Sequence, residues 1–338
     1  MTHAKLSPSA ADKWLNCPGS IQAEEKYTTK YGNPPSSSFA EEGTMAHTLG
    51  ETCLNNGTDP VYYIGDKIDN KEVTEDMAQA VQKYVDYTRV LEGKLMVETK
   101  IDLRKYIPEG FGTCDAYVLT EDVLHIIDYK HGVGVKVFAD NNPQMKLYAL
   151  GIVSALDFEG EVHLHIVQPR ANNFSFWQTT SKDLLIFGEE VKIKAAKVLN
   201  SDAPRIPSDK ACKWCKAKAT CPELADITNK AIAMDFNDME EENIVYILEN
   251  EKLITSLINS VKEHAMQNIP RGYKLIPTTG NRKWTDEATA AKLLGERAYE
   301  QKLISPTQAL KLKLLPPGID ELIYKPEGDP KLVKDGFD

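Results

Sequence analysis

The stretch GFGTCDAYVLTEDVLHIIDYKHG (110–132) decides the fold of this chain and contains its most informative charges. The apolar runs on either side of TED (120–122) predict two strands joined by a tight turn. Residues two apart on a strand point to the same face, so Asp128 and Lys130 are expected to project together. Asp115 approaches them across the hairpin. We therefore expect two carboxylates and an ammonium to converge at one place.

Two converging carboxylates form a hard oxygen site that suits Mg²⁺ or Mn²⁺, and a neighbouring ammonium orients water or holds a phosphate. This is the chemistry of phosphodiester hydrolysis. An ordinary charged surface hairpin shows the same D-x-K pattern as Asp128 and Lys130. The flanking segments have to decide between the two interpretations.

Both flanking segments predict helices with polar side chains at set positions. EEGTMAHTLGE (41–51) is expected to be a helix that carries His47. NNPQMKLYALG (141–151) is expected to be a helix that carries Gln144 and Tyr148 one turn apart on one face. The order along the chain is then a helical His, an Asp, a D-x-K hairpin and a helical Q-x-x-x-Y.

This order resembles the RecB-type branch of the PD-(D/E)XK nucleases, specifically over 1–225 and loosely beyond. The resemblance implies an α/β fold with a restriction-endonuclease-like core, a mixed sheet flanked by helices. The similar proteins include nucleases of bacteriophage and prophage replication or recombination modules. Many relatives carry Glu where this chain has Asp128, and either carboxylate binds a metal. The family's motif positions are matched in order by His47, Asp115, Asp128, Lys130, Gln144 and Tyr148.

The resemblance also implies roles for the metal-binding residues. Asp115 and Asp128 hold the catalytic Mg²⁺ or Mn²⁺. His47 joins the metal ligands, and the backbone carbonyl of Tyr129 is a further expected ligand. The activity implied is that of a metal-dependent deoxyribonuclease.

The remaining motif residues are expected to act on the substrate. Lys130 positions the attacking water and counters charge that develops on the phosphorane. Gln144 and Tyr148 hold the scissile strand or orient Lys130. By family analogy the substrate is a DNA end or a single strand, which places an exonuclease ahead of an endonuclease.

Three of the six cysteines form the pattern C-x2-C-x5-C, namely Cys212, Cys215 and Cys221. Such close spacing lets several thiolates converge on one metal centre. A fourth ligand is needed, and Cys17 is the best candidate because its Cys-Pro step repeats the one that follows Cys221. Cys53 lacks this spacing, as does Cys114, and both are expected to be buried small residues.

A distant N-terminal cysteine joined to a C-terminal triplet resembles the iron–sulfur staple of AddB-type and CRISPR-associated RecB-like nucleases. There a [4Fe–4S] cluster ties the two ends of the nuclease domain together; a structural Zn²⁺ is the alternative here. The resemblance implies a nuclease domain over 1–229 and a mostly helical accessory region over 230–338. Within that region, 272–285 predicts two short strands and 305–318 a capped helix.

The charge of the chain opposes binding of nucleic acid through its overall field. The formal net charge is −10, so local basic patches would have to contact DNA. Lys213 and Lys216 flank Trp214, a combination suited to backbone contacts and base stacking, although a solvated helix face looks the same. Arg170 follows a predicted strand and is a further expected phosphate contact.

Composition favours an intracellular globular protein, and the resemblance to phage and prophage nucleases implies the cytoplasm of a bacterial host. Of the 338 residues, 42% are apolar and 27% are charged. No apolar run reaches the length of about 18 residues that a membrane span needs, and the first residues lack an apolar signal core. Clustered thiolates suit a reducing compartment.

Two other functions remain open from the sequence. One is a non-catalytic iron–sulfur module that binds DNA or a recombination or replication protein, although the intact Asp115, Asp128 and Lys130 argue against it. The other is a CRISPR-type factor that processes DNA ends or spacers together with partner proteins.

Overall fold

A computed structural model describes residues 4–34, 37–237 and 240–276 of the chain. The described residues belong almost entirely to one compact unit, Met1–Leu275, and Ile276–Asp338 forms a second unit. The helix predicted over 305–318 lies outside the described residues, as does most of the strand pair predicted over 272–285.

The centre of the first unit is a mixed sheet of five strands in the order β3-β4-β5-β6-β7. Only the β5–β6 pair in this sheet is parallel, and the chain crosses from one to the other through a helix. The predicted hairpin, crossover helix and mixed sheet are confirmed, and β7 was not predicted. The strands are β3 (Lys94–Asp102), β4 (Phe111–Leu119), β5 (Val123–Tyr129), β6 (Glu161–Gln168) and β7 (Asn173–Thr180).

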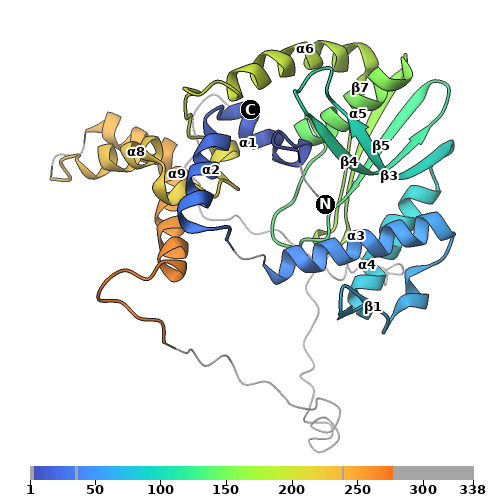
Figure 1. The fold of residues 1–338 in the computed structure, drawn as a ribbon, viewed down its shortest axis with the longest axis horizontal. Helices are drawn as coiled ribbons and strands as arrows, with labels where there is room; N and C mark the ends of the chain where they lie inside the picture. Colours follow the sequence, from blue (N-terminus) through green and yellow to red (C-terminus); the bar gives the residue numbers. More distant parts are fainter. Residues whose placement is uncertain (1–3, 35–36, 238–239, 277–338) are drawn as a thin grey trace, which may run out of the picture. The chain divides into compact units, whose positions relative to one another are not determined.

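Helices cover both faces of this sheet (Figure 1). A short antiparallel pair, β1 (Lys67–Ile68) and β2 (Lys71–Glu72), lies before the fourth helix. The α-helices are α1 (Ala11–Asn16), α2 (Ser20–Tyr31), α3 (Ser38–Asn56), α4 (Glu75–Arg89), α5 (Pro143–Leu156), α6 (Ser181–Val198), α7 (Asp209–Cys212), α8 (Pro222–Ile232) and α9 (Glu241–Gln267).

The alternation of side chains along β5 divides the core into two layers. Ile126 faces α5 and packs in a cluster with Met145 and the fully buried Trp14 of α1. Ile127 faces the other way and packs with Val81 of α4 and residues of α3. Because successive strand residues point to opposite faces, one strand serves both layers.

The start of α5 is fixed by local chemistry that also positions the site. The Asn142 side chain accepts a hydrogen bond from Met145 N at 3.2 Å, and Pro143 occupies the first turn. The left-handed Asp157 (φ 48°) ends the helix. Gln144 therefore lies in the first turn of α5, beside the end of β5.

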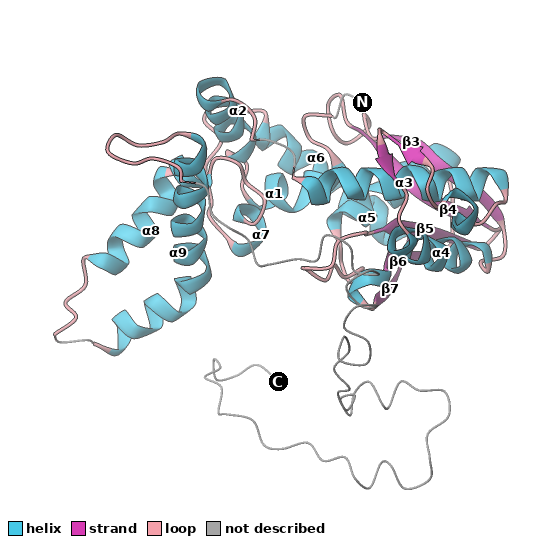
Figure 2. Ribbon diagram, turned by 90° about the horizontal axis from the view of Figure 1, so that it is seen from below, coloured by secondary structure: helices cyan, strands magenta, loops and turns pink. Residues whose placement is uncertain are grey.

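The region after the sheet is helical, as predicted, over its described residues (Figure 2). Leu253 and Leu257 of α9 pack against Leu224 of α8 and Cys212 of α7. This places α9 against the cysteine-bearing segment, within the first unit. The domain boundary at residue 230 stays a prediction. Of the described helices, none is long and apolar enough to cross a membrane.

Candidate active site and cysteine cluster

The β3–β4 ladder is interrupted at one point, where it skips Glu98 and Asp115. Glu98 has φ 44°, in the left-handed region that residues other than glycine seldom adopt. Such interruptions of a ladder re-aim side chains and are frequent beside active sites. Here the interruption brings the carboxylates of Glu98 and Asp115 together; from the sequence, Glu98 could equally reach the site or remain at the surface.

Asp115 is held from two directions. Its Oδ2 accepts a hydrogen bond from the backbone N–H of Tyr129 at 2.8 Å, and His47 Nδ1 of α3 lies 3.4 Å from the same oxygen. His47, Glu98 and Asp115 each offer a ligand atom, and these three atoms lie within 4.8 Å of one another. The arrangement suits a single cation.

Asp128 and Lys130 form the second half of the cluster. Asp128 is 2% exposed, and its Oδ2 lies 2.8 Å from Lys130 Nζ. Gln144 bridges the pair, because its Nε2 donates to Asp128 Oδ1 at 3.0 Å and its Oε1 accepts from Lys130 Nζ at 3.3 Å. Gln144 Nε2 also lies 3.2 Å from the hydroxyl of Tyr148. The structure thus brings together the side chains of every motif residue predicted from the sequence.

Burial and neighbouring charges shift the pKa values of the acidic groups in different directions. Burial, with the charge of Asp115, raises the pKa of Asp128 and raises that of Glu98 to about 7. At Asp115 burial acts in the same sense, but His47, Lys130 and the Tyr129 N–H outweigh it and lower the pKa. Burial favours the neutral amine of Lys130, yet the two aspartates raise its pKa, so it stays an ammonium.

The donor set fits a divalent cation bound mainly through oxygen. Among the described residues, Asp128 Oδ2 receives no hydrogen bond of good geometry, although the Lys130 ammonium is close. Three carboxylates face one ammonium and one imidazole, so a bound cation would let all three ionise.

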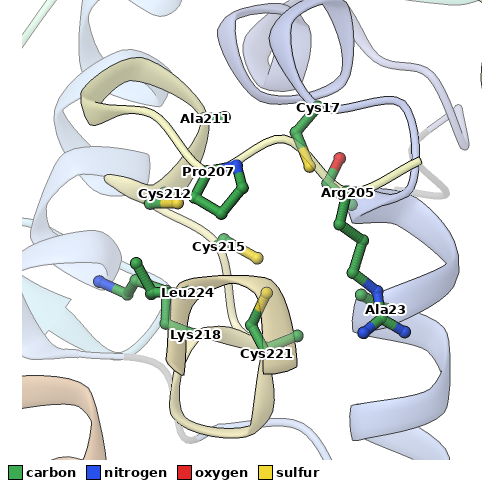
Figure 3. A pocket seen from close by; sticks show the side chains of 12 residues that line it. Cys17, Ala23, Arg205, Pro207, Ala211, Cys212, Cys215, Lys218, Cys221 and Leu224 are labelled. Carbon is green, nitrogen blue, oxygen red and sulfur yellow. The ribbon is translucent and has the colours of Figure 1, made fainter. Parts of the chain in front are cut away.

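Four cysteines line one small cavity away from this cluster (Figure 3). Cys17 follows α1, Cys212 ends α7, Cys215 lies in the next turn, and Cys221 precedes α8. Burial raises the pKa of all four thiols, that of Cys215 to about 12. Among the described residues, no three of these four sulfur atoms all lie within 4.8 Å of one another.

The cavity joins distant parts of the chain. The backbone N–H of Ile206 donates to Cys17 Sγ at 3.2 Å, and Gly19 N donates to Pro204 O at 2.8 Å. Cys53 and Cys114 are fully buried in the two core layers, as predicted.

A groove of about 680 Å³ is lined by Lys130 and Gln144 of the carboxylate cluster and by residues of the cysteine-bearing segment. Both Lys130 and Trp214, which is 72% exposed, line it. Of the other predicted DNA contacts, Lys213 lines the groove and Lys216 does not. The Lys216 Nζ instead donates a hydrogen bond to Asn33 Oδ1 at 3.2 Å. The charged residues that line the groove are Asp12, Lys13, Lys130, Lys136, Asp140, Asp209, Lys210 and Lys213.

Arg170 lies in a network behind the site that the sequence did not reveal. Its guanidinium pairs with Glu42 at 2.9 Å and with Asp76 at 3.2 Å, so its charge is engaged by carboxylates. His131 Nε2 lies 3.2 Å from the same Glu42, and its Nδ1 lies 2.7 Å from the hydroxyl of Tyr129. The position of His131 directly after the D-x-K motif was the available signal.

These features define the protein as a mixed α/β protein with a largely buried carboxylate–lysine cluster and a separate group of four thiols. The chain belongs to the family described as "Protein of unknown function (DUF2800)", whose model matches residues 3–336. Among solved structures, it is similar to one titled "Crystal structure of SSO0001", with 12% identity over 66% of this chain and 88% of that chain and a TM-score of 0.34. A likeness at that TM-score carries no argument about function.

Proposed function

We propose that this protein is a metal-dependent DNA nuclease with a RecB-like, restriction-endonuclease-like core. The observation that supports this most is the meeting of Asp115, Asp128 and Lys130, the last of which lines a groove together with four other lysines. Phosphodiester hydrolysis needs a cation-binding carboxylate pair and a positive charge beside the reacting phosphate. Asp115 and Asp128 supply the first and Lys130 the second.

The residues that would hold the cation are Asp115 and Asp128, with His47 and Glu98 beside Asp115. A bound Mg²⁺ or Mn²⁺ supplies Lewis acidity to the phosphate and lowers the pKa of bound water. The raised pKa of Glu98, about 7, is consistent with a carboxylate that ionises fully only when a cation neutralises its neighbours.

Lys130 is the residue that we expect to act on the substrate. Its ammonium remains protonated because two aspartates raise its pKa, and the residue lines the groove. From there it positions the attacking water and offsets negative charge on the phosphorane. Gln144 keeps Lys130 beside Asp128 by hydrogen-bonding both side chains, while Tyr148 anchors the amide.

The groove supports DNA as the substrate despite the net charge of −10. Five lysines line it, and the exposed Trp214 offers a face on which an unpaired base can stack. Stacking on an aromatic ring requires an unstacked base, which favours a single strand or a frayed end and therefore an exonuclease. The resemblance of the motif order to RecB-like nucleases of phage and prophage modules further suggests a role in DNA replication or recombination.

We further propose that Cys17, Cys212, Cys215 and Cys221 hold a [4Fe–4S] cluster. Their thiols line one cavity, and four sulfur donors suit iron–sulfur or zinc. The resemblance of this cysteine pattern to the iron–sulfur staple of RecB-like nucleases favours the cluster, and a structural Zn²⁺ on the same four thiols is the alternative.

A digestion assay tests the proposed activity. End-labelled single-stranded and double-stranded DNA are incubated with the protein in Mg²⁺, Mn²⁺ or EDTA, and Asp115→Ala is run in parallel. We expect cleavage with either metal, none in EDTA, and a loss on the order of 10³-fold in the variant, since a metal ligand supplies several kcal/mol. DNA binding without turnover under every condition would instead support the non-catalytic accessory module.

A further inference from the structure

Three of the chain's seven histidines meet on the sheet, away from the carboxylate cluster. In the parallel β5–β6 pair, His125 lies opposite His163, and Ile127 lies opposite His165. Because Ile127 packs in the layer under α3 and α4, all three imidazoles lie on that face. Asp128, an odd number of residues from His125, projects to the other face.

The ring nitrogens of these histidines converge. His125 Nδ1 lies 3.0 Å from His165 Nε2, and each of the three rings offers one nitrogen within 4.8 Å of the other two. Tetrahedral zinc with Zn–N bonds of about 2.0–2.1 Å places nitrogen ligands about 3.4 Å apart. The arrangement is therefore within a small side-chain adjustment of a metal site.

Two of the rings are also held on the side away from this convergence. His165 Nδ1 lies 2.9 Å from the Tyr87 hydroxyl of α4, and His163 Nε2 lies 3.1 Å from Glu161 Oε2. Metal-binding histidines almost always give their second nitrogen to such a partner, which fixes the tautomer. The bond from His163 Nε2 leaves its Nδ1 as the nitrogen available to a metal.

The surroundings favour the neutral form of two of the rings, and an exposed aromatic side chain lies beside the cluster. Burial and the neighbouring rings lower the pKa of His165 to about 3, and burial with His163 lowers that of His125. Neutral imidazole is the form that binds metals. Phe176, 51% exposed, lies with its ring 5.2 Å from those of His163 and His165 and forms one wall.

We propose that His125, His163 and His165 form a binding site for one zinc-type transition-metal cation, with a fourth position open to water. Three nitrogen ligands favour Zn²⁺, Ni²⁺ or Cu²⁺ over Mg²⁺, which prefers oxygen. The site is separate from the proposed nuclease centre and does not depend on that function. A metal bound there would cross-link β5 to β6 through His125 on one strand and His163 and His165 on the other. The strand β5 also carries Asp128 and is followed by Lys130.

The test measures zinc bound per chain after saturation in excess Mg²⁺, followed by dialysis. The double variant His125→Gln/His163→Gln removes two partly exposed ligands, and Gln178→Ala changes the exposed residue paired with His163 without removing a ring nitrogen. We expect the double variant to bind one zinc fewer than the wild type, and Gln178→Ala to bind as many. Because zinc on the cysteines is common to all three proteins, it cancels in this comparison.

A second measurement needs no variant. In wild-type protein with ¹⁵N-labelled histidine, zinc must shift the ring-nitrogen signals of His125, His163 and His165 together. Equal zinc content in the wild type and the double variant would overturn the proposal. So would three ring signals that do not respond to zinc.

Discussion

At the scale of single residues, one amide organises the candidate site. Gln144 accepts from Lys130 and donates to Asp128, so it holds an ammonium and a carboxylate in register. Its position in the first turn of α5 follows from the Asn142 cap. A neutral side chain can do this without adding charge to a site that already holds several acidic groups.

Replacing this amide gives the first prediction. Gln144→Ala should lower the rate of DNA cleavage by about 10–100-fold, because hydrogen bonds to charged groups contribute about 1.5–3 kcal/mol. Tyr148→Phe, which removes only the hydroxyl beside the amide, should have a smaller effect. Single-turnover rates of both variants check this. A larger loss in Tyr148→Phe than in Gln144→Ala would contradict the bridging role.

Glu98 gives the second prediction through its raised pKa. Burial raises this pKa from 4.5 to about 7, so the folded protein binds a proton that the unfolded chain releases between these values. Stability that depends on Glu98 is thus present at low pH and is lost as the pH rises to about 7. In EDTA, Glu98→Gln should therefore gain stability over the wild type at pH 8 but not at pH 4.5.

Urea unfolding of both proteins at the two pH values measures this difference. An equal difference at pH 4.5 and pH 8 would show that Glu98 ionises freely in the folded protein, as an exposed carboxylate does.

The same residues show what the sequence can and cannot predict at a site. Asp128 and Lys130 were predictable because a two-residue spacing on a strand fixes their common face. For Glu98 the sequence left both a place in the site and a place at the surface open, because its approach to Asp115 depends on an interrupted ladder between two strands. His131, which follows β5, also needed the structure, since its partner Glu42 lies 89 positions away on α3.

At the scale of elements, close packing of α5 against the sheet sets the position of Gln144. A Cβ added to Gly151 of α5 would lie 2.2 Å from Ile101 Cγ2 of β3. By contrast, a Cβ on Gly43 of α3 would meet nothing within 4 Å. Gly151 therefore permits the close approach of α5 to β3, whereas no close contact requires a glycine at Gly43.

This contrast gives the third prediction. Gly151→Ala should destabilise the protein by about 1–3 kcal/mol through overpacking and should reduce cleavage as α5 shifts. Gly43→Ala should stabilise it by about 0.5–1 kcal/mol, because glycine is unfavourable inside a helix. Chemical denaturation of both variants measures the effects. A stabilising Gly151→Ala would refute the close packing.

Strong periodicity made most elements predictable, and its absence hid one. The helix predicted over 41–51 lies within α3 (Ser38–Asn56), and the helix predicted over 141–151 is observed as α5 (Pro143–Leu156). β7 was missed because it lies at the sheet edge, where Phe174 and Phe176 point outward and remain about half exposed. An edge strand with aromatics on its open face lacks the usual alternation of apolar-in and polar-out.

At the scale of the whole molecule, the cysteine cavity joins the segment after α1 to the segment between α7 and α8. Cys17 and Cys212 lie almost two hundred positions apart in sequence and line the same cavity. A cross-link over such a loop restricts the unfolded chain by several kcal/mol in entropy models. The close spacing of Cys212, Cys215 and Cys221 could be read from the sequence. Only the folded chain shows that Cys17 lines their cavity, whereas Cys53 is buried in a core layer.

The fourth prediction follows from the proposed cross-link. Protein purified anaerobically should be brown, absorb broadly near about 400 nm and contain about four irons per chain. Cys17→Ala should lose iron nearly as fully as Cys212→Ala, whereas Cys53→Ala should keep it. Iron analysis checks each protein. Full iron retention in Cys17→Ala would exclude it as a ligand, and a colourless protein with one zinc would replace the cluster with a zinc staple.

The central claim is tested most directly by comparing two lysines of one groove. Lys130 adjoins Asp128 in the cluster, and the exposed Lys136 lines the same groove farther out. In single-turnover cleavage of end-labelled DNA with Mg²⁺, Lys130→Ala should lose on the order of 10³-fold in rate. Lys136→Ala should change by less than about fivefold, since an exposed charge contributes at most about 1 kcal/mol. Near wild-type cleavage by Lys130→Ala would contradict the assignment of the active site.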